Sequence, residues 1–553
     1  MARRRFAPRA DALEGRALLA TLTVTSAAAS GDGSLRAAIE RADLDPARDT
    51  IVFAPSLRGQ TIRLDGSPLA IDSSLSIQGP GSGSLRISGE GLGGVFTLSG
   101  GAADVSISGL SISGGRANQG GGIQSQAGRL ELNDVVLAGN QATDGGALAQ
   151  LGGTLIVRRS VFLNNRAEGQ DARGGAIYLG PSTTAEIARS QFVGNKASAE
   201  GTARGGAIAA QAGVTLSVSD SRFAENRAAG ATNSLGGAID GAPAAEFPGP
   251  GAGRIALTNT TFAGNAADSR DGRGGTSFGG ALAAQGFAVS VSGGSFAGNL
   301  ARGGDAGSTG GGRGDGIGGA IYAAPLAEAV DLVITNATFA GNAAVGGAGG
   351  AEGGSGQGGA LVTFQPTTIT DSSFLGNRAE GGTASGTGSV AGFADGGAIQ
   401  DHASTTITRS LLLGNLARGG NGTGGANGGA GQGGAIADSG SLSLNQTRVL
   451  LNAALGGSGT VGGDAYGGGI STSNFGNATT LTDSLVSGNQ ALGGGGGPPP
   501  PPRPGGGGGG GGGPPPPPPP RRRPRSGRGH RRLHRHDPAG PLARRRQPGV
   551  DRR

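Results

Sequence analysis

The stretch GGAIYLGPSTTAEIARSQFVGN, residues 174–195, contains both halves of a motif that recurs through most of the chain. It begins with Gly-Gly-Ala-Ile and ends with Phe-x-x-Asn. The first half, Gly-Gly-Ala/Gly-Ile/Leu, recurs with its last residue at Ile123, Leu148, Ile177, Ile208, Ile239, Leu282, Ile321, Leu361, Ile399, Ile436 and Ile470. The second half, an asparagine three residues after an apolar residue, recurs at Asn140, Asn165, Asn195, Asn226, Asn265, Asn299, Asn342, Asn377, Asn415, Asn452 and Asn489. The two series alternate strictly, so the motif defines a repeating unit.

Within each unit the apolar residues alternate with polar ones, as in Thr154–Val157, Thr215–Val218 and Arg254–Leu257. This period of two is typical of β-strands and not of helices. Units whose asparagines lie 25 to 43 residues apart cannot bury their apolar side chains alone, so neighbouring units must stack. The sequence therefore predicts an all-β fold, a right-handed parallel β-helix in which equivalent residues lie above one another.

Two rows of like residues are predicted to run along this solenoid. The Gly-Gly pair suits a tight corner, because glycine adopts positive φ and lets backbones approach. Stacked phenylalanines would add about 0.5–1.5 kcal/mol per pair, and stacked asparagines would form a hydrogen-bonded amide ladder. The predicted rows are Phe162, Phe192, Phe223, Phe262, Phe296, Phe339 and Phe374, and Asn165, Asn195, Asn226, Asn265, Asn299, Asn342 and Asn377.

Composition narrows the possible functions. The chain has no cysteine, which excludes disulfides, Cys-ligated metal and thiol catalysis. Of its net charge of +7, residues 503–553 carry fourteen Arg against two Asp, or +12, which leaves 7 − 12 = −5 for the rest. A mildly acidic body does not predict a nucleic-acid partner. No apolar run approaches the roughly 20 residues of a membrane-spanning helix, and no cofactor or metal is predicted.

The N-terminal part carries a cap and family resemblances. Leu35, Ala38, Ile39 and Ala42 follow helical spacing, which predicts an amphipathic helix over the first coil. Residues 23–39 together with 49–53 closely resemble the N-terminal module of bacterial surface β-helix proteins of the CSLREA and choice-of-anchor type. The repeats resemble those of polymorphic outer-membrane proteins, and residues 6–19 resemble an LEPR-XLL motif. These resemblances imply a bacterial β-helix displayed outside the cell.

The chain is predicted to divide into four parts: an export-like segment 1–20, a cap with first coils 21–100, repeats 101–492, and a tail 493–553. The tail consists of polyglycine, polyproline and an Arg-rich end. It lacks the material for a core and is predicted to be disordered. Two interpretations remain open for it: a solvated basic tail that binds acidic polymers or nucleic acid, or out-of-frame translation that replaces the native C-terminus.

Catalytic residues were sought because right-handed β-helices include polysaccharide lyases and hydrolases, which need clustered carboxylates. The position after the motif's Ile or Leu reads Gln124, Ala149, Tyr178, Ala209, Asp240, Ala283, Tyr322, Val362, Gln400, Ala437 and Ser471, without such a cluster. One position further, Asp401 and Asp438 fall in adjacent coils, with His402 beside the first. They are the catalytic candidates, although turn formation explains them equally well.

The leading functional hypothesis is a non-enzymatic, adhesin-like protein of the cell surface or extracellular space. Its lengthening Gly-rich segments, such as Leu300–Ile317, would form a flexible fringe that contacts polysaccharide, matrix or other surface proteins. The alternative is a polysaccharide lyase or hydrolase of the β-helix class.

Overall fold

The computed structural model describes residues 20–44, 47–101, 103–242, 253–269, 273–306, 313–326, 330–473 and 478–497. Most of segment 1–20 and nearly all of the tail 493–553 therefore lie outside the described residues. The four-part division of the chain stays a prediction.

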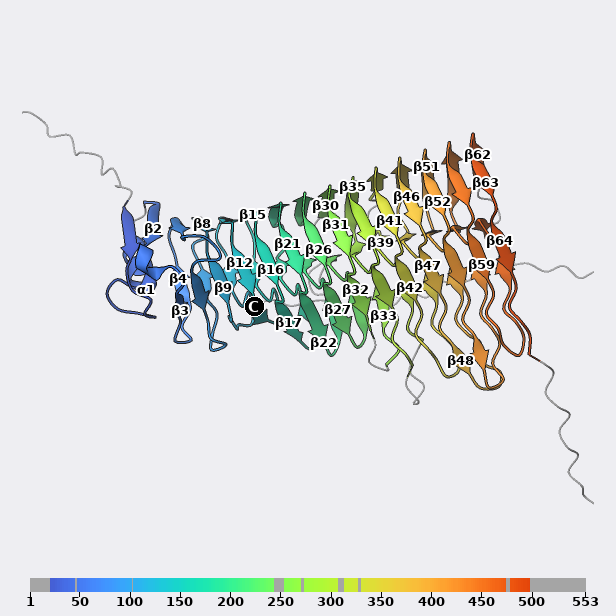
Figure 1. Cartoon of the computed structure of the whole chain (residues 1–553), viewed down its shortest axis with the longest axis horizontal. Coiled ribbons are helices and arrows are strands. Elements are labelled where there is room, and N and C mark those ends of the chain that lie inside the picture. Colours follow the sequence, from blue (N-terminus) through green and yellow to red (C-terminus); the bar gives the residue numbers. More distant parts are fainter. Residues whose placement is uncertain are drawn as a thin grey trace, which may run out of the picture. The chain divides into compact units, whose positions relative to one another are not determined.

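The described chain is a right-handed parallel β-helix whose coils stack along one axis (Figure 1). The fold class is confirmed. One representative coil runs through β19 (Ile177–Leu179), β20 (Thr184–Ala188), β21 (Gln191–Val193), β22 (Lys196–Ala199) and β23 (Thr202–Arg204). Each strand pairs in parallel with its equivalent in the next coil.

This stacking generates five large sheets, which we number in the order a coil visits them, and one two-stranded sheet of β48 (Ala384–Ser385) and β54 (Gly422–Thr423). Sheet 1 has 13 strands, from β4 (Leu69–Ile71) to β61 (Ile470–Thr472), and sheet 2 has 15, from β1 (Thr21–Val24) to β62 (Thr479–Thr482). Sheet 3 has 14, from β3 (Thr61–Arg63) to β63 (Leu485–Ser487). Sheet 4 has 11, from β13 (Gln141–Ala142) to β64 (Gln490–Leu492), and sheet 5 has 9, from β18 (Ala172–Arg173) to β60 (Ala465–Tyr466). Sheets 1 to 3 enclose the core, and sheets 4 and 5 form a projecting fin.

The helix α1 (Leu35–Ala42) covers the N-terminal end, as predicted. The Ser34 hydroxyl accepts a hydrogen bond from the backbone N–H of Ala37, which caps the first turn. Leu35, Ile39 and Ala42 are buried, and the helix packs against β1 and β4. The first coil is thereby shielded from solvent on its open side.

The phenylalanines stack inside sheet 3. Neighbouring rings from Phe162 to Phe374 have centroids 4.6–4.9 Å apart and planes within 9° of parallel. All seven side chains are fully buried. Each coil from β16 (Val161–Leu163) to β46 (Ser373–Leu375) contributes one of these rings to the core, always from the middle of its sheet 3 strand.

The asparagines form a continuous ladder next to these rings. Each Oδ1 accepts from both the backbone N–H and the Nδ2 of the asparagine in the preceding coil, as Asn265 does from Asn226 at 3.1 and 2.9 Å. Each Nδ2 also donates to a backbone carbonyl, in this case that of Phe223 at 3.0 Å. Every amide inside the ladder is thus saturated, so a buried polar row is stable.

The Gly-Gly corners join the fin to sheet 1. Gly205 has φ +59, and a Cβ on Gly206 would lie 2.1 Å from the carbonyl oxygen of Gly237 in the next coil. No other residue meets both requirements, which explains the motif.

The described Gly-rich segments pair with one another along the fin, and the flexibility of the predicted fringe stays a prediction. The outgoing and returning arms of the fin are tied by backbone hydrogen bonds between glycines. The backbone N–H of one glycine donates to the carbonyl oxygen of the other at 2.7–2.9 Å in the pairs Gly347 to Gly314, Gly354 to Gly347, Gly382 to Gly354 and Gly392 to Gly382. The same alternation continues through Gly420, Gly429, Gly457, Gly463 and Gly494. The arms approach so closely that a Cβ on Gly382 would lie 1.9 Å from the Gly347 oxygen.

Candidate functional site

The structure brings Asp401 and Asp438 together, but inside a corner. They end β50 (Ile399–Asp401) and β56 (Ile436–Asp438) in direct register and are 0% and 4% exposed. Asp401 Oδ1 accepts from the Ala403 N–H at 3.0 Å, and Asp438 Oδ1 from the Gly440 N–H at 2.8 Å. Thr363 makes the same turn one coil earlier, accepting from the Gln365 N–H at 3.1 Å. Burial raises the pKa of Asp401 to about 6 and also raises the pKa of Asp438.

His402 lies on the opposite, outer side, because side chains alternate along a strand. Its ring stacks on Phe364, with centroids 4.3 Å apart and planes 8° from parallel. Phe364 in turn lies 6.1 Å from Tyr322 of the preceding coil, edge to face. Phe364 is 40% exposed, so this aromatic group presents a ring to solvent on the outer face of sheet 1.

Two outward rows meet where the fin joins sheet 1, and we call this surface the corner face. One row, in sheet 1, is the position after the motif's Ile or Leu. The other lies in sheet 5 and immediately precedes each Gly-Gly; it comprises Gln119, Asp144, Arg173, Arg204, Leu235, Phe278, Ile317, Gln357, Asp395, Gln432 and Tyr466. The rows touch: Arg204 Nη1 lies 3.3 Å from Asp240 Oδ2, and the Phe278 and Tyr322 rings are 4.9 Å apart.

The polar groups of the corner face carry little net charge. Arg204 pairs with Asp240, and Arg173 Nε lies 3.6 Å from Asp144 Oδ1. Burial raises the pKa of Asp395 to about 7, with no opposing charge nearby to lower it. Among the described residues, buried Asp395 Oδ1 and Gln400 Oε1 find no hydrogen-bond partner.

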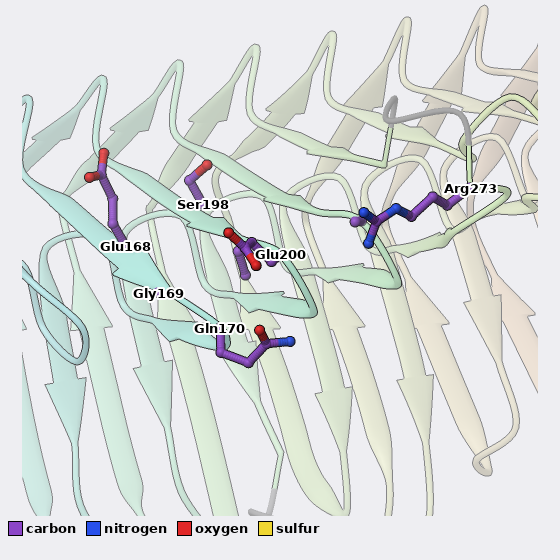
Figure 2. Close-up of a pocket in the computed structure, with 8 residues that line it drawn as sticks. Glu168, Gly169, Gln170, Ser198, Glu200 and Arg273 are labelled. Atoms are coloured by element: carbon purple, nitrogen blue, oxygen red, sulfur yellow. The ribbon is translucent and has the colours of Figure 1, made fainter. Parts of the chain in front are cut away.

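A further hollow of about 740 Å³ lies on the fin (Figure 2). Glu168 and Ser198 come from equivalent positions of β17 (Arg166–Gly169) and β22, and Glu200 follows β22. Arg273 approaches from a later coil, with its guanidinium directed toward Glu200. Glu168 accepts from Gln141 Nε2 at 2.7 Å. The hollow has no aromatic lining, unlike the corner face.

Sequence reasoning missed Phe364, Asp395 and Gln400 as site residues. It read the sheet 1 row alone and found no cluster there. The sequence does contain a signal for this site. The residues that precede each Gly-Gly form the row that faces the sheet 1 row, so the site is visible only when both rows are compared. In the described residues no group of three or more His, Asp or Glu could hold a metal ion.

No family model and no curated protein matches the chain. Among solved structures, the chain is similar to the catalytic domain of a GH87 alpha-1,3-glucanase in complex with nigerose: 11% identity, 84% of this chain, 69% of that chain, TM-score 0.33. It is similar to the A-module of the Azotobacter vinelandii mannuronan C-5 epimerase AlgE6: 9% identity, 84% and 98% of the chains, TM-score 0.29. A third is the PL6 family alginate lyase AlyGC: 9% identity, 84% and 100%, TM-score 0.18.

These comparisons correct one expectation. The prediction of a non-enzymatic protein is corrected, because the three neighbours just named are a hydrolase, an epimerase and a lyase. At 9–11% identity and TM-scores of 0.33 and below, the likeness to them shows the fold alone. The resemblance to named surface families stays a prediction. Within the described residues, no helix has the length and apolar character needed to cross a membrane.

Proposed function

We propose that this protein binds a polysaccharide along the corner face and acts on it as an enzyme. The observation that carries the proposal is the aromatic group Tyr322, Phe364 and His402, whose Phe364 ring is 40% exposed. Aromatic residues make up only 3% of the sequence, and most phenylalanines are buried in the core. An exposed ring held by stacking is therefore a specific feature of this face.

A sugar ring fits such a group for a physical reason. The C–H bonds on one face of a pyranose are weakly positive, and an aromatic ring is negative on its face. Successive coils repeat at about 4.8 Å, so a linear polymer lying along the axis meets one rung after another. Asp395 and Gln400 lie on consecutive strands, β49 (Ala394–Asp395) and β50, on either side of one Gly-Gly corner of the same surface.

Asp395 supplies the chemistry in this proposal. Burial raises the pKa of its carboxyl to about 7, so a large fraction is protonated at neutral pH. A carboxylic acid in that state donates its proton to the leaving oxygen as the glycosidic C–O bond breaks, and water adds to the anomeric carbon and gives up a proton that restores the acid. Asp401 and Asp438 have a supporting position, because their Oδ1 atoms hold the corner turns behind His402. We place the protein outside the cell, where such polymers occur, in line with the resemblance of residues 23–53.

Affinity electrophoresis of the full chain through gels containing single neutral or acidic polysaccharides tests the binding. Phe364→Ala should weaken retention about tenfold, since loss of stacking costs about 0.5–1.5 kcal/mol beyond burial. Val333→Ala is the matched control, because Val333 is also 40% exposed but lies on the outer face of sheet 2. Unchanged retention of Phe364→Ala would refute the site.

Turnover is tested separately with the polysaccharide that binds best. Release of reducing ends or unsaturated products by the wild type, lost in Asp395→Asn while retention persists, is the expected result. Wild-type binding without any product, under all conditions from pH 4 to 9, would exclude the enzymatic part and leave the binding site intact.

A further inference from the structure

A second cavity lies at the opposite end of the corner face from the aromatic group. It is an open hollow of about 570 Å³, lined by Asn118, Gln119, Gln124, Thr143 and Asp144. This volume falls within the range of about 300–1,000 Å³ that is usual for small-molecule sites. We call it the head pocket.

Two consecutive rungs line the head pocket. Gln119 and Asp144 are neighbours in the sheet 5 row, with Arg173 on the rung beyond. Gln124 faces them from the middle of β10 (Ile123–Ser125) in sheet 1. The Asn118 carbonyl accepts from the N–H groups of Thr143 and Asp144, at 3.0 and 3.1 Å, which holds the wall in place. The polar side chains are thus positioned by the same backbone stacking that orders the core.

The lining excludes several classes of ligand. Asp144 is the one acid among the five residues, and Arg173 Nε at 3.6 Å from its Oδ1 balances its charge. The Asp144 carboxylate would repel an anionic ligand. A cationic ligand would have to compete with the Arg173 guanidinium for the same carboxylate. None of the five side chains is apolar, so a hydrophobic ligand gains nothing.

The lining suits one class well. Three amides and a hydroxyl supply both donors and acceptors without charge. The Asp144 carboxyl pairs with Arg173 and accepts a hydrogen bond from the Gln119 side chain, so it holds Gln119 in place in the wall of the pocket. A ligand with several adjacent hydroxyl groups would use all of these groups at once.

We propose that the head pocket binds a single neutral sugar unit, either a free monosaccharide or the end of a sugar chain. The pocket is distinct from the aromatic group. Six rungs, through Ala149, Tyr178, Ala209, Asp240 and Ala283, separate Gln124 from Tyr322. At about 4.8 Å per rung that is roughly 29 Å, so the two sites cannot share one sugar.

The test is isothermal titration of the full chain with the methyl glycosides of glucose, galactose, mannose and xylose. Glucuronate and glucosamine serve as charged counterparts. At least one neutral glycoside should bind, and Gln124→Leu, which keeps the size but removes the amide, should weaken it at least tenfold. Asn118→Ala, in an exposed segment, should weaken it several-fold. Gln191→Leu, an exposed glutamine on the outer face of sheet 3, should leave it unchanged.

The outcomes separate this inference from the proposed function. Phe364→Ala should leave glycoside binding unchanged, whereas it reduces retention by the polysaccharide. No binding by any neutral glycoside, tighter binding of a charged one, or wild-type affinity in a folded Gln124→Leu protein would overturn the head pocket. Loss of glycoside binding in Phe364→Ala would also overturn it, because the sugar would then occupy the aromatic group.

Discussion

Replacing Asn265 by alanine tests whether the amide ladder stabilises the β-helix. The change removes four hydrogen bonds: two accepted from Asn226 at 3.1 and 2.9 Å, one donated to the Phe223 carbonyl at 3.0 Å, and one donated to Asn299 at 2.9 Å. Asn226 then keeps two buried donors, its backbone N–H and one Nδ2 hydrogen, without partners.

The magnitude follows from these two donors. Each stranded buried donor costs about 1–3 kcal/mol, so the free energy of unfolding should fall by about 2–6 kcal/mol. In a solenoid each coil contacts only its neighbours, so the loss is concentrated near the substitution. Native-state hydrogen exchange should therefore show accelerated exchange of the amides of β26 (Arg222–Ala224), β31 (Thr261–Ala263) and β36 (Ser295–Ala297).

Two controls define the result. Thr258→Ala changes an exposed residue of the same coil and should alter stability by less than about 0.5 kcal/mol. Asn489→Ala removes three bonds at the part-buried last step of the ladder and should cost less than Asn265→Ala. Equal urea midpoints and exchange rates for Asn265→Ala and Thr258→Ala would refute the ladder as a source of stability.

Three further predictions concern the core, the fin and the corner face. Phe262→Ala opens a gap between rings at 4.9 and 4.7 Å and should cost about 3–5 kcal/mol in urea unfolding; a cost below 1 kcal/mol would contradict a stacked core. Gly382→Ala places a Cβ 1.9 Å from the Gly347 oxygen and should lower the melting temperature, whereas Gly350→Ala, with nothing within 4 Å, should not; equal melting curves would refute the close approach. A folded-state pKa of Asp395 raised from 3.8 to about 7 means that the native state binds more protons, so stability should fall as pH rises through this window, and Asp395→Asn should reduce that fall. Identical pH profiles of the two proteins in chemical unfolding would show that Asp395 is not buried.

The sequence predicted the fold because its decisive interactions are between like residues. An asparagine stacked on an asparagine or a phenylalanine on a phenylalanine leaves a visible repeat, and the motif spacing determines which residues meet. The hydrogen bonds of the fin could not be predicted, for the opposite reason. Polyglycine carries no side-chain pattern, so the backbone hydrogen bonds from Gly347 to Gly494 are invisible in composition, which alone predicts flexibility.

The candidate site was harder to predict because it depends on residues that do not repeat. Asp401 and Asp438 were noticed as adjacent carboxylates, yet alternation along the strand directs them inward, while Phe364 and His402 face outward. The sheet 1 row and the sheet 5 row face each other only because the chain folds back from the fin at each Gly-Gly corner. Only the three-dimensional path of the coil brings Phe278 to Tyr322.

Partners in the asparagine ladder are separated by as few as 25 and as many as 43 residues, yet they bond at 3.0 and 2.9 Å. The extra length of the longest coil falls in the sequence between β37 (Leu300–Arg302) and β38 (Gly316–Ile317), two strands of the fin. Mutation can thus lengthen or shorten one turn without shifting its neighbours. A protein built this way can change the length and sequence of one coil at a time while the stacking of the other coils is kept.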